Sequence, residues 1–299
     1  MKKLSGRLLI AVFTVIVLLS STGFAEVYNL TETIKFLGSS STTNLGLSQP
    51  RDVAFDNSGN MYVASYGNSR IFKRDTSGNW TTFGSSIGNP RKIVYYGGYI
   101  YVIDNTYNVK YAYVNATYPS WTTLNISNKL YIGSIMSFAV SSTLPAKFYV
   151  GTTKGVYQLN AVSTGYTAVQ LLALTSGIDG IAVDSFNHVY ASTQGQIWSS
   201  YDPVDAINKW VKLTSVAYSS DLAIDSSNNI YVTVTGSDSS VQKFSAVAVL
   251  LAKMGNYTAS RNPSGLTVYP GSSNVYAACS DMNAITVFKP MKIFTPLPR

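Results

Sequence analysis

Short apolar runs separated by turn residues recur along this chain at nearly constant spacing. Residues 49–84 hold the first complete set, in which four β patterns are divided by turns such as Asn-Ser-Gly-Asn. The first of these runs, residues 52–56, returns at 92–96, 137–141, 180–184, 221–225 and 265–269. Successive runs end 40 to 45 residues apart. A repeat of this length with four strands in each unit is typical of β-propeller blades.

A second strand follows each run and places a tyrosine at the same point of every unit: Tyr62, Tyr101, Tyr149, Tyr190, Tyr231 and Tyr276. We expect these tyrosines to pack in the blade core with their hydroxyl groups hydrogen-bonded locally. Third strands are expected at 70–73, 109–113, 156–159, 197–199, 241–244 and 285–289. Fourth strands are expected at 80–83, 121–124, 168–172, 210–213 and 249–254.

The chain is therefore predicted to be all-β, a six-bladed β-propeller with four antiparallel strands in each blade and a single domain over residues 26–299. The middle residue of each first strand is small enough for a crowded axis: Ala54, Val94, Ala139, Ala182, Ala223 or Thr267. The sixth unit has no fourth strand of its own, because prolines follow residue 289 and proline disfavours strands. We expect the N-terminal residues 31–36 to complete the last blade and close the ring, which removes exposed sheet edges.

The first 25 residues do not belong to this repeat. Lys2, Lys3 and Arg7 precede an apolar run over residues 8–19, and small residues stand at 23 and 25. This pattern predicts a secretory signal peptide over residues 1–25, cleaved after Ala25, and hence a secreted or cell-envelope protein. The apolar run is short for a membrane span, so membrane contact is expected only through an uncleaved signal segment.

Composition narrows the choice of partner. Only 12% of the residues are charged, about half the usual share, so the surface must be rich in Ser, Thr, Asn and Tyr. Without the signal peptide the chain keeps all 14 acidic residues and loses three of its 22 basic ones, which leaves a mild and scattered positive charge. No basic stripe with interleaved aromatic residues is visible, so no nucleic-acid partner is expected. The single cysteine, Cys279, is expected to be a small buried residue.

Three stretches resemble the NHL repeat: residues 49–71, 221–232 and 262–268. The first reads Gln-Pro-Arg-Asp-Val-Ala-Phe-Asp, then Gly-Asn-Met-Tyr-Val-Ala, then Gly-Asn-Ser-Arg-Ile. The resemblance covers residues 31–289 in all and implies a six-bladed propeller. It does not imply one function, because proteins of this kind include protein-binding modules, extracellular sensor domains, RNA-binding modules and enzymes on related propellers.

Propeller ligands usually meet the face formed by the loops that enter the first strands and the loops that join the second and third strands. The residues of these loops that we select as a binding rim are Arg51, Tyr66, Asn68, Arg91, Asp104, Lys154, Arg261 and Asp281. The alternative for each is a turn former or a solvated loop charge, a role in which Asn and Asp are common. We expect a protein or glycan partner on this rim, with no catalysis and no cofactor.

One catalytic alternative remains open. Enzymes on related propellers use several histidines around zinc or a buried glutamate near the axis. This chain has a single histidine, His188, and its two glutamates, Glu26 and Glu32, lie in the N-terminal segment. Calcium needs only oxygen ligands. The alternative is therefore a calcium-dependent enzyme of the lactonase or lyase type, with an axial metal site formed by Asp52, Asp179 and Asp221.

Overall fold

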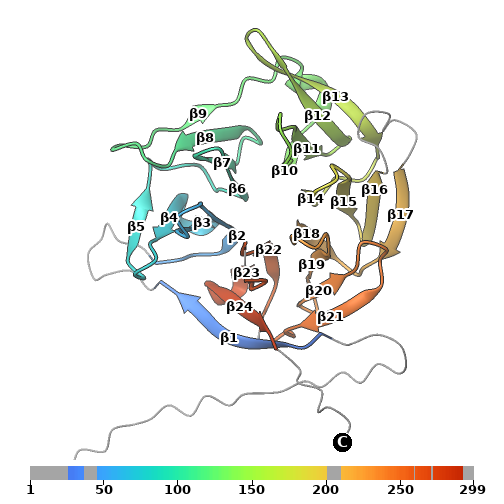
Figure 1. Ribbon diagram of the computed structural model, residues 1–299. Coiled ribbons are helices and arrows are strands. Elements are labelled where there is room, and N and C mark those ends of the chain that lie inside the picture. Colours follow the sequence, from blue (N-terminus) through green and yellow to red (C-terminus); the bar gives the residue numbers. More distant parts are fainter. Residues whose placement is uncertain (1–25, 37–45, 201–209, 259, 271, 292–299) are drawn as a thin grey trace, which may run out of the picture.

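The computed structural model describes residues 26–36, 46–200, 210–258, 260–270 and 272–291. Within them, six sheets of four antiparallel strands stand around a central axis (Figure 1). This arrangement is the six-bladed β-propeller that the repeat predicted. The predicted signal peptide, residues 1–25, lies outside the described residues. No helix among those described is long and apolar enough to cross a membrane.

Each blade runs from an inner strand beside the axis to an outer strand at the periphery (Figure 1). Blades 1 to 3 consist of β2 (Pro50–Phe55), β3 (Met61–Ser65), β4 (Arg70–Arg74) and β5 (Trp80–Phe83); β6 (Lys92–Tyr96), β7 (Tyr99–Ile103), β8 (Val109–Tyr113) and β9 (Thr122–Thr123); and β10 (Ile135–Val140), β11 (Phe148–Thr152), β12 (Gly155–Val162) and β13 (Gly165–Ala173).

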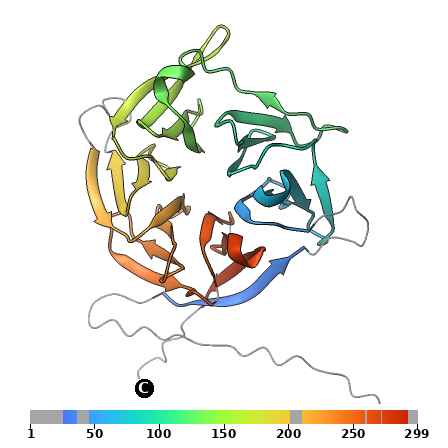
Figure 2. The ribbon, with the colours of Figure 1, turned by 180° about the vertical axis from the view of Figure 1, so that it is seen from behind.

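Blades 4 to 6 follow the same order. They consist of β14 (Gly180–Val183), β15 (Val189–Thr193), β16 (Gln196–Ser200) and β17 (Trp210–Ser215); β18 (Ser219–Ile224), β19 (Ile230–Val234), β20 (Ser240–Phe244) and β21 (Leu250–Met254); and β22 (Pro263–Val268), β23 (Val275–Cys279), β24 (Ala284–Pro290) and β1 (Tyr28–Lys35). In the described part of the chain, the short helices η1 (Tyr66–Asn68), α1 (Lys129–Ile132) and η3 (Ser280–Met282) lie in loops of one face, which is turned toward the viewer in Figure 2.

The fourth strand of blade 2 is shorter than predicted. Only Thr122–Thr123 of the expected 121–124 forms β9. Trp121 instead packs edge-on against Phe83 of blade 1, with ring centroids 5.8 Å apart, and its indole Nε1 donates to the Ser85 carbonyl at 3.0 Å. The bulk of this tryptophan therefore fills the space between two blades rather than extending the ladder.

The ring is closed by the N-terminal strand, as predicted. β1 pairs antiparallel with β24, with Leu30 opposite Phe288 and Ile34 opposite Ile285. It begins at Tyr28, earlier than the predicted start at residue 31. In both views the N-terminal strand lies beside the last strand of the chain (Figures 1 and 2). Closure gives the last blade the same number of strands as the other five.

A buried polar cluster also ties β1 to blade 5. The Lys243 ammonium, of which 5% is exposed, binds the Glu26 carboxylate and lies 3.3 Å from the Tyr28 hydroxyl. The Tyr28 and Tyr231 hydroxyl groups are 3.0 Å apart, and Tyr231 donates to Asp225 at 3.0 Å. The closing strand is thus fixed by both a ladder and a side-chain network.

The repeated tyrosines are core residues, and three of them bond to an aspartate of the same blade. Tyr62 donates to Asp56 at 3.0 Å, Tyr190 to Asp184 at 3.1 Å and Tyr231 to Asp225 as described. Each aspartate ends the inner-strand run and also accepts bonds from the backbone of the turn that follows, so it satisfies the turn and the core at once. This confirms that the hydroxyl groups of these three are satisfied locally.

Blade 3 lacks this aspartate, because Ser141 stands at the equivalent position. The Tyr149 hydroxyl is consequently buried without a hydrogen-bond partner among the described residues. Burial raises the pKa of Tyr149 to about 12. A buried donor without a partner costs free energy, so two equivalent tyrosines of this fold contribute differently to its stability.

We therefore expect opposite results from one substitution in two blades. Tyr62→Phe breaks a bond to a carboxylate and should lower the free energy of unfolding by about 1–3 kcal/mol. Tyr149→Phe removes an unpaired hydroxyl and should be neutral or stabilising by about 1 kcal/mol. Urea unfolding followed by fluorescence measures both, and equal losses in the two variants would contradict this account.

Candidate functional site

The predicted rim residues lie on the face that carries the short helices, which we call the rim face. On it, the loop entering a blade bonds to the loop between the second and third strands of the blade before. The Gln49 N–H donates to Asn283 at 2.7 Å, Asn89 donates to the Tyr66 carbonyl at 3.0 Å, and the Gly236 N–H donates to Asn262 at 3.3 Å. These bonds tie the rim loops of neighbouring blades together.

Two predicted arginines and one predicted tyrosine lie in one row that crosses from blade 1 to blade 2. The Arg51 Cζ is 4.9 Å from the centre of the Tyr66 ring, and the Arg91 Cζ is 5.3 Å from the same centre. The Arg91 Cζ is also 5.4 Å from the centre of the Tyr107 ring. We call these four residues the arginine–tyrosine row. Cation–π attraction fixes its two guanidinium groups in place.

The guanidinium groups of the row have no hydrogen-bond acceptor and no carboxylate partner among the described residues. Arg51 and Arg91 are half-buried, and the Nε atom of each is buried without a hydrogen bond. Within the described chain neither arginine forms an ion pair with a carboxylate. Charged groups that are partly removed from water are normally paired. Arg70, at the rim end of β4, also has a buried Nε without a hydrogen bond, but the row is the place where two such arginines contact one ring.

The other predicted rim residues are engaged elsewhere. The Asn68 amide donates to the Gly46 carbonyl at 2.6 Å, and the Lys154 ammonium donates to the Tyr131 carbonyl at 2.9 Å. Asp104 is buried, accepts from Thr106 at 2.6 Å and pairs with Lys110 at 2.9 Å. These three residues are chiefly loop-forming.

Arg261 and Asp281 belong to the last blade and stand apart from the row. Arg261 stacks on a separate tyrosine, with its Cζ 4.9 Å from the centre of the Tyr257 ring. Asp281 accepts from the Asn262 amide. Sequence reasoning missed Tyr107 and Tyr257. Both could have been found from the sequence, because Tyr107 lies in a loop between second and third strands and Tyr257 lies in a loop that enters a first strand.

A second polar feature, also missed, lies on the axis. Lys92 extends from blade 2 toward blade 5, where its Nζ lies 2.8 and 2.7 Å from the two carboxylate oxygens of Asp221. The same Nζ lies 3.2 Å from Asp52 of blade 1. The aligned runs place these three residues at the same position of their inner strands, which is the signal that could have found Lys92.

Each carboxylate of this axial cluster also binds the next blade around the ring. Asp52 accepts from the Ile93 N–H at 2.9 Å, and Asp221 accepts from the Leu266 N–H at 3.1 Å. The blade before each aspartate has glycine at this position. A Cβ on Gly265 would lie 2.3 Å from the Arg51 carbonyl oxygen, and one on Gly180 would lie 2.7 Å from the Leu222 nitrogen. Glycine is therefore required by close approach of the neighbouring backbone.

Two carboxylates share one ammonium in this buried cluster. Burial raises the pKa of Asp52 to about 7, Lys92 acts against the rise, and Asp221 adds to it. For Lys92, burial opposes the charge, but Asp221 and then Asp52 outweigh it and raise the pKa above its ordinary range. The lysine thus stays charged, while Asp52 holds its proton to much higher pH than an exposed aspartate does.

The structure does not bring the three predicted calcium ligands together in one group. The Lys92 ammonium already lies between Asp52 and Asp221, where a cation would have to bind. Asp179 lies one residue before the axial position, is exposed on the rim face, and accepts from the Gln194 N–H at 3.4 Å. Among the described residues no group of three His, Cys, Asp or Glu side chains could hold a metal ion.

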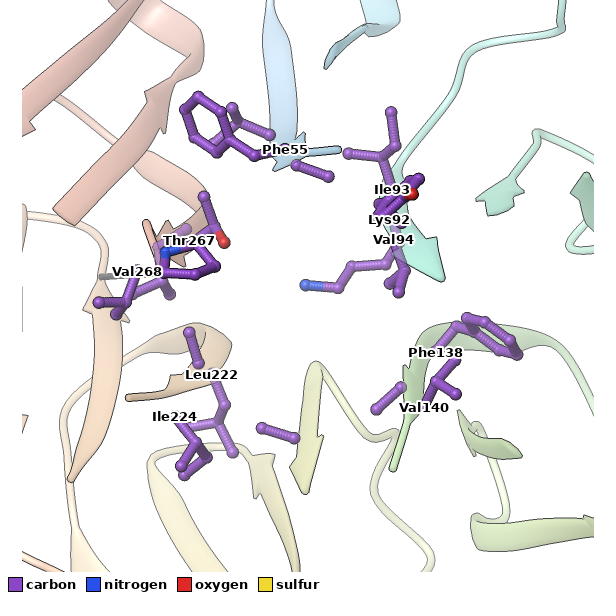
Figure 3. A pocket seen from close by; sticks show the side chains of 18 of the residues that line it. Phe55, Lys92, Ile93, Val94, Phe138, Val140, Leu222, Ile224, Thr267 and Val268 are labelled. Atoms are coloured by element: carbon purple, nitrogen blue, oxygen red, sulfur yellow. The ribbon is translucent and has the colours of Figure 1, made fainter. Parts of the chain in front are cut away.

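A cavity of about 590 Å³ with both polar and apolar lining residues follows the axis and includes Lys92 in its wall. Figure 3 shows the lysine reaching into its middle, with Val140, Ile224 and Val268 around it. The predicted small residues of the inner strands all line it: Ala54, Val94, Ala139, Ala182, Ala223 and Thr267. Its lining continues to turn residues such as Pro270, so it extends toward the face opposite the rim.

Two further groups with chemical potential have structural surroundings. The His188 Nδ1 lies 2.8 Å from the Asp184 carboxylate in a turn of blade 4. Cys279 is fully buried, as expected, and burial raises the pKa of its thiol to about 11. A thiol at this pKa is protonated at neutral pH and is a poor nucleophile.

No family model and no curated protein sequence matches this chain, so the NHL resemblance stays a prediction. Solved structures do match. A Bacteroides thetaiotaomicron protein of unknown function has a TM-score of 0.66 at 13% identity, over 82% of this chain and 70% of that chain. A streptogramin B lyase has a TM-score of 0.61 at 13% identity, over 91% of this chain and 100% of that chain.

A gluconolactonase from Xanthomonas campestris is also similar, with a TM-score of 0.64 at 8% identity, over 89% of this chain and 100% of that chain. At such identities these matches show the shared propeller fold alone. Activity depends on the residues of a site, and unrelated functions occur on one fold.

We expect Lys92→Met to destabilise the fold by about 3–5 kcal/mol, because it leaves two carboxylates buried without a cation. Adding Asp221→Asn should recover part of this loss, since one buried charge is then removed. Lys110→Met is a matched control, because 29% of Lys110 is exposed in its pair with Asp104, and it should cost less. Urea unfolding compares the four proteins, and equal losses for Lys92→Met and Lys110→Met would argue against the axial cluster.

The raised pKa of Asp52 predicts a pH dependence. Between its ordinary value of 3.8 and about 7, the folded state binds a proton that the unfolded state has released. Stability from this group is therefore full below pH 3.8 and is lost as pH rises to about 7. Relative to Asp52→Asn, the wild-type free energy of unfolding should fall over this range and be level above it. A difference that rises with pH instead would mean that Lys92 lowers the pKa of Asp52.

Proposed function

We propose that this protein is an exported, non-catalytic six-bladed propeller that binds a protein or glycan partner on its rim face. The single observation that carries the proposal is the arginine–tyrosine row, in which Arg51 and Arg91 are held against tyrosine rings with no counter-charge among the described residues. Stacked and unpaired guanidinium groups are suited to binding a partner, because their donors are oriented before the partner arrives.

The surroundings of the row favour an extended contact. Leu130 and Tyr131 of α1 are 94% and 77% exposed, and Tyr218, in the loop entering blade 5, is 74% exposed. All three lie in loops of the rim face. Tyrosine and arginine are the residue types that most often dominate binding energy at interfaces. The rim face therefore supplies apolar contact area around a charged centre.

The axis supports a binding role over a catalytic one. Lys92 and its two aspartates lie on the axis next to the rim, and each of the three charged groups is engaged by another. His188 and Cys279, described above, lie away from the axis within their own blades. The streptogramin B lyase and the gluconolactonase are therefore comparable with this chain in fold alone. The charged groups of this chain that support binding are the two arginines of the row on the rim face.

Site-specific photo-crosslinking tests the proposal in the cells that produce the protein. A benzophenone amino acid replaces Tyr218 on the rim face or, as a matched control, Tyr118, which is 90% exposed in the loop after β8 on the other face. We expect covalent adducts from position 218 only. Reversing Arg51, Arg91 and Arg261 together to Glu should abolish them without lowering the melting temperature. Adducts from both positions in equal yield, or from 118 alone, would reject the rim face.

A further inference from the structure

We infer that the arginine–tyrosine row receives two carboxylate groups from a short acidic segment of a protein partner. This inference rests on the proposed function and deepens it, since it names the chemistry that the same rim recognises. Arg51 and Arg91 would each bind one carboxylate, and Tyr66 would separate the two sites. Arginine suits this role because its planar fork matches the two oxygens of a carboxylate.

The first argument is charge. Two half-buried guanidinium groups contact one tyrosine ring, and the described residues provide neither with a carboxylate or a hydrogen-bond acceptor. Like charges this close repel one another, and partial burial reduces the compensation from water. An anionic ligand would relieve both costs, whereas a neutral ligand would relieve neither.

The second argument is preorganisation. Arg51 belongs to β2 and Arg91 directly precedes β6, where the Arg91 N–H donates to the Ile103 carbonyl at 2.9 Å. Tyr66 is held by the bond from Asn89 to its carbonyl and by the Gly67 N–H, which donates to the Ser48 carbonyl at 2.9 Å. Because the backbone and the rings already fix both guanidinium groups, little freedom is lost on binding.

The third argument is spacing. Since the Tyr66 ring centre lies 4.9 Å from one Cζ and 5.3 Å from the other, the two Cζ atoms are at most 10.2 Å apart. Side chains at i and i+2 of an extended strand are on one side and roughly 7 Å apart. An extended segment with acidic residues at alternate positions can therefore reach both arginines at once.

The charge pattern of the rest of the rim favours a short acidic segment over a long polyanion. Asp179 and Asp281 are exposed on the rim loops of blades 4 and 6, and Lys154 and Arg261 are exposed on those of blades 3 and 6. A nucleic acid or a uronate polysaccharide that crossed the rim would meet charges of both signs, so its many negative charges would find no continuous positive track. A protein segment can place its two carboxylates on the row and offer neutral or apolar groups to Leu130, Tyr131 and Tyr218.

Binding of a labelled peptide to the complete propeller, residues 26–299, tests the inference. The probe is Ser-Glu-Thr-Glu-Ser, its Gln analogue is the control ligand, and polygalacturonate represents an acidic glycan. We expect the Glu peptide to bind at least about tenfold more tightly than the Gln peptide in fluorescence anisotropy. Arg51→Gln with Arg91→Gln should remove this preference, while Arg74→Gln, at the opposite end of β4, should keep it.

The comparison of the Glu and Gln peptides needs no variant, so it decides the question even where the double substitution impairs folding. Equal binding of the two peptides overturns the inference. So does a preference that survives the double substitution, or tighter binding of polygalacturonate through the same arginines, which would assign an acidic glycan instead. If the peptides fail while position 218 still gives adducts, the inference fails and the proposed function stands; if both fail, both are rejected.

Discussion

Crowding at the axis is the constraint on which this structure depends. Six inner strands converge there, and each offers one side-chain position at the rim end of the channel. In blade order these positions hold Asp52, Lys92, Ser137, Gly180, Asp221 and Gly265. Each aspartate reaches the backbone of the next blade, and the glycine of the blade before leaves room for it. The lysine then links the two aspartates across the ring. Neighbouring blades are thus joined by directional bonds as well as by apolar packing.

This arrangement separates the two ends of the axis. On the rim side, the axial cluster pairs its charges internally, whereas the arginine–tyrosine row has no carboxylate partner among the described residues. On the other side the axis is a cavity in which Asp56 and Asn57 lie beside small and aliphatic residues. In the described part of the chain, the two arginines of the row therefore lie on the rim face, one residue before the axial positions in blades 1 and 2. A partner that approaches this face meets the row first and the axial cluster beneath it.

The fold could be predicted from the sequence because each blade repeats the same pattern of strands and turns. Apolar runs, turn residues and one tyrosine per unit mark strands whose partners are near in the chain, and the missing sixth outer strand pointed to residues 31–36. The axial cluster was harder, because Lys92 and Asp221 are 129 positions apart and residue type does not show which side chain crosses the channel. Asp179 was expected at the axis, but it precedes the axial residue Gly180 by one position. Its side chain is therefore exposed in the loop that enters blade 4. Tyr107 lies beside Arg91 in a turn where its own backbone is left-handed, with φ of 57°. The amino-acid sequence does not predict this conformation.

The closing strand has a consequence for how the molecule assembles. Thr31 bonds to Val287, 256 positions later in the chain, so the first strand to be synthesised pairs with one of the last. Contacts over such a separation form late, after the loop entropy of the whole ring has been overcome. During synthesis β1 has no partner, and β24 presents an open edge when it emerges. The β1 strand of a second chain could pair with that edge in place of the chain's own β1. Because only the pairing between chains depends on protein concentration, dilute solution favours refolding into a closed ring and concentrated solution favours strand-swapped copies.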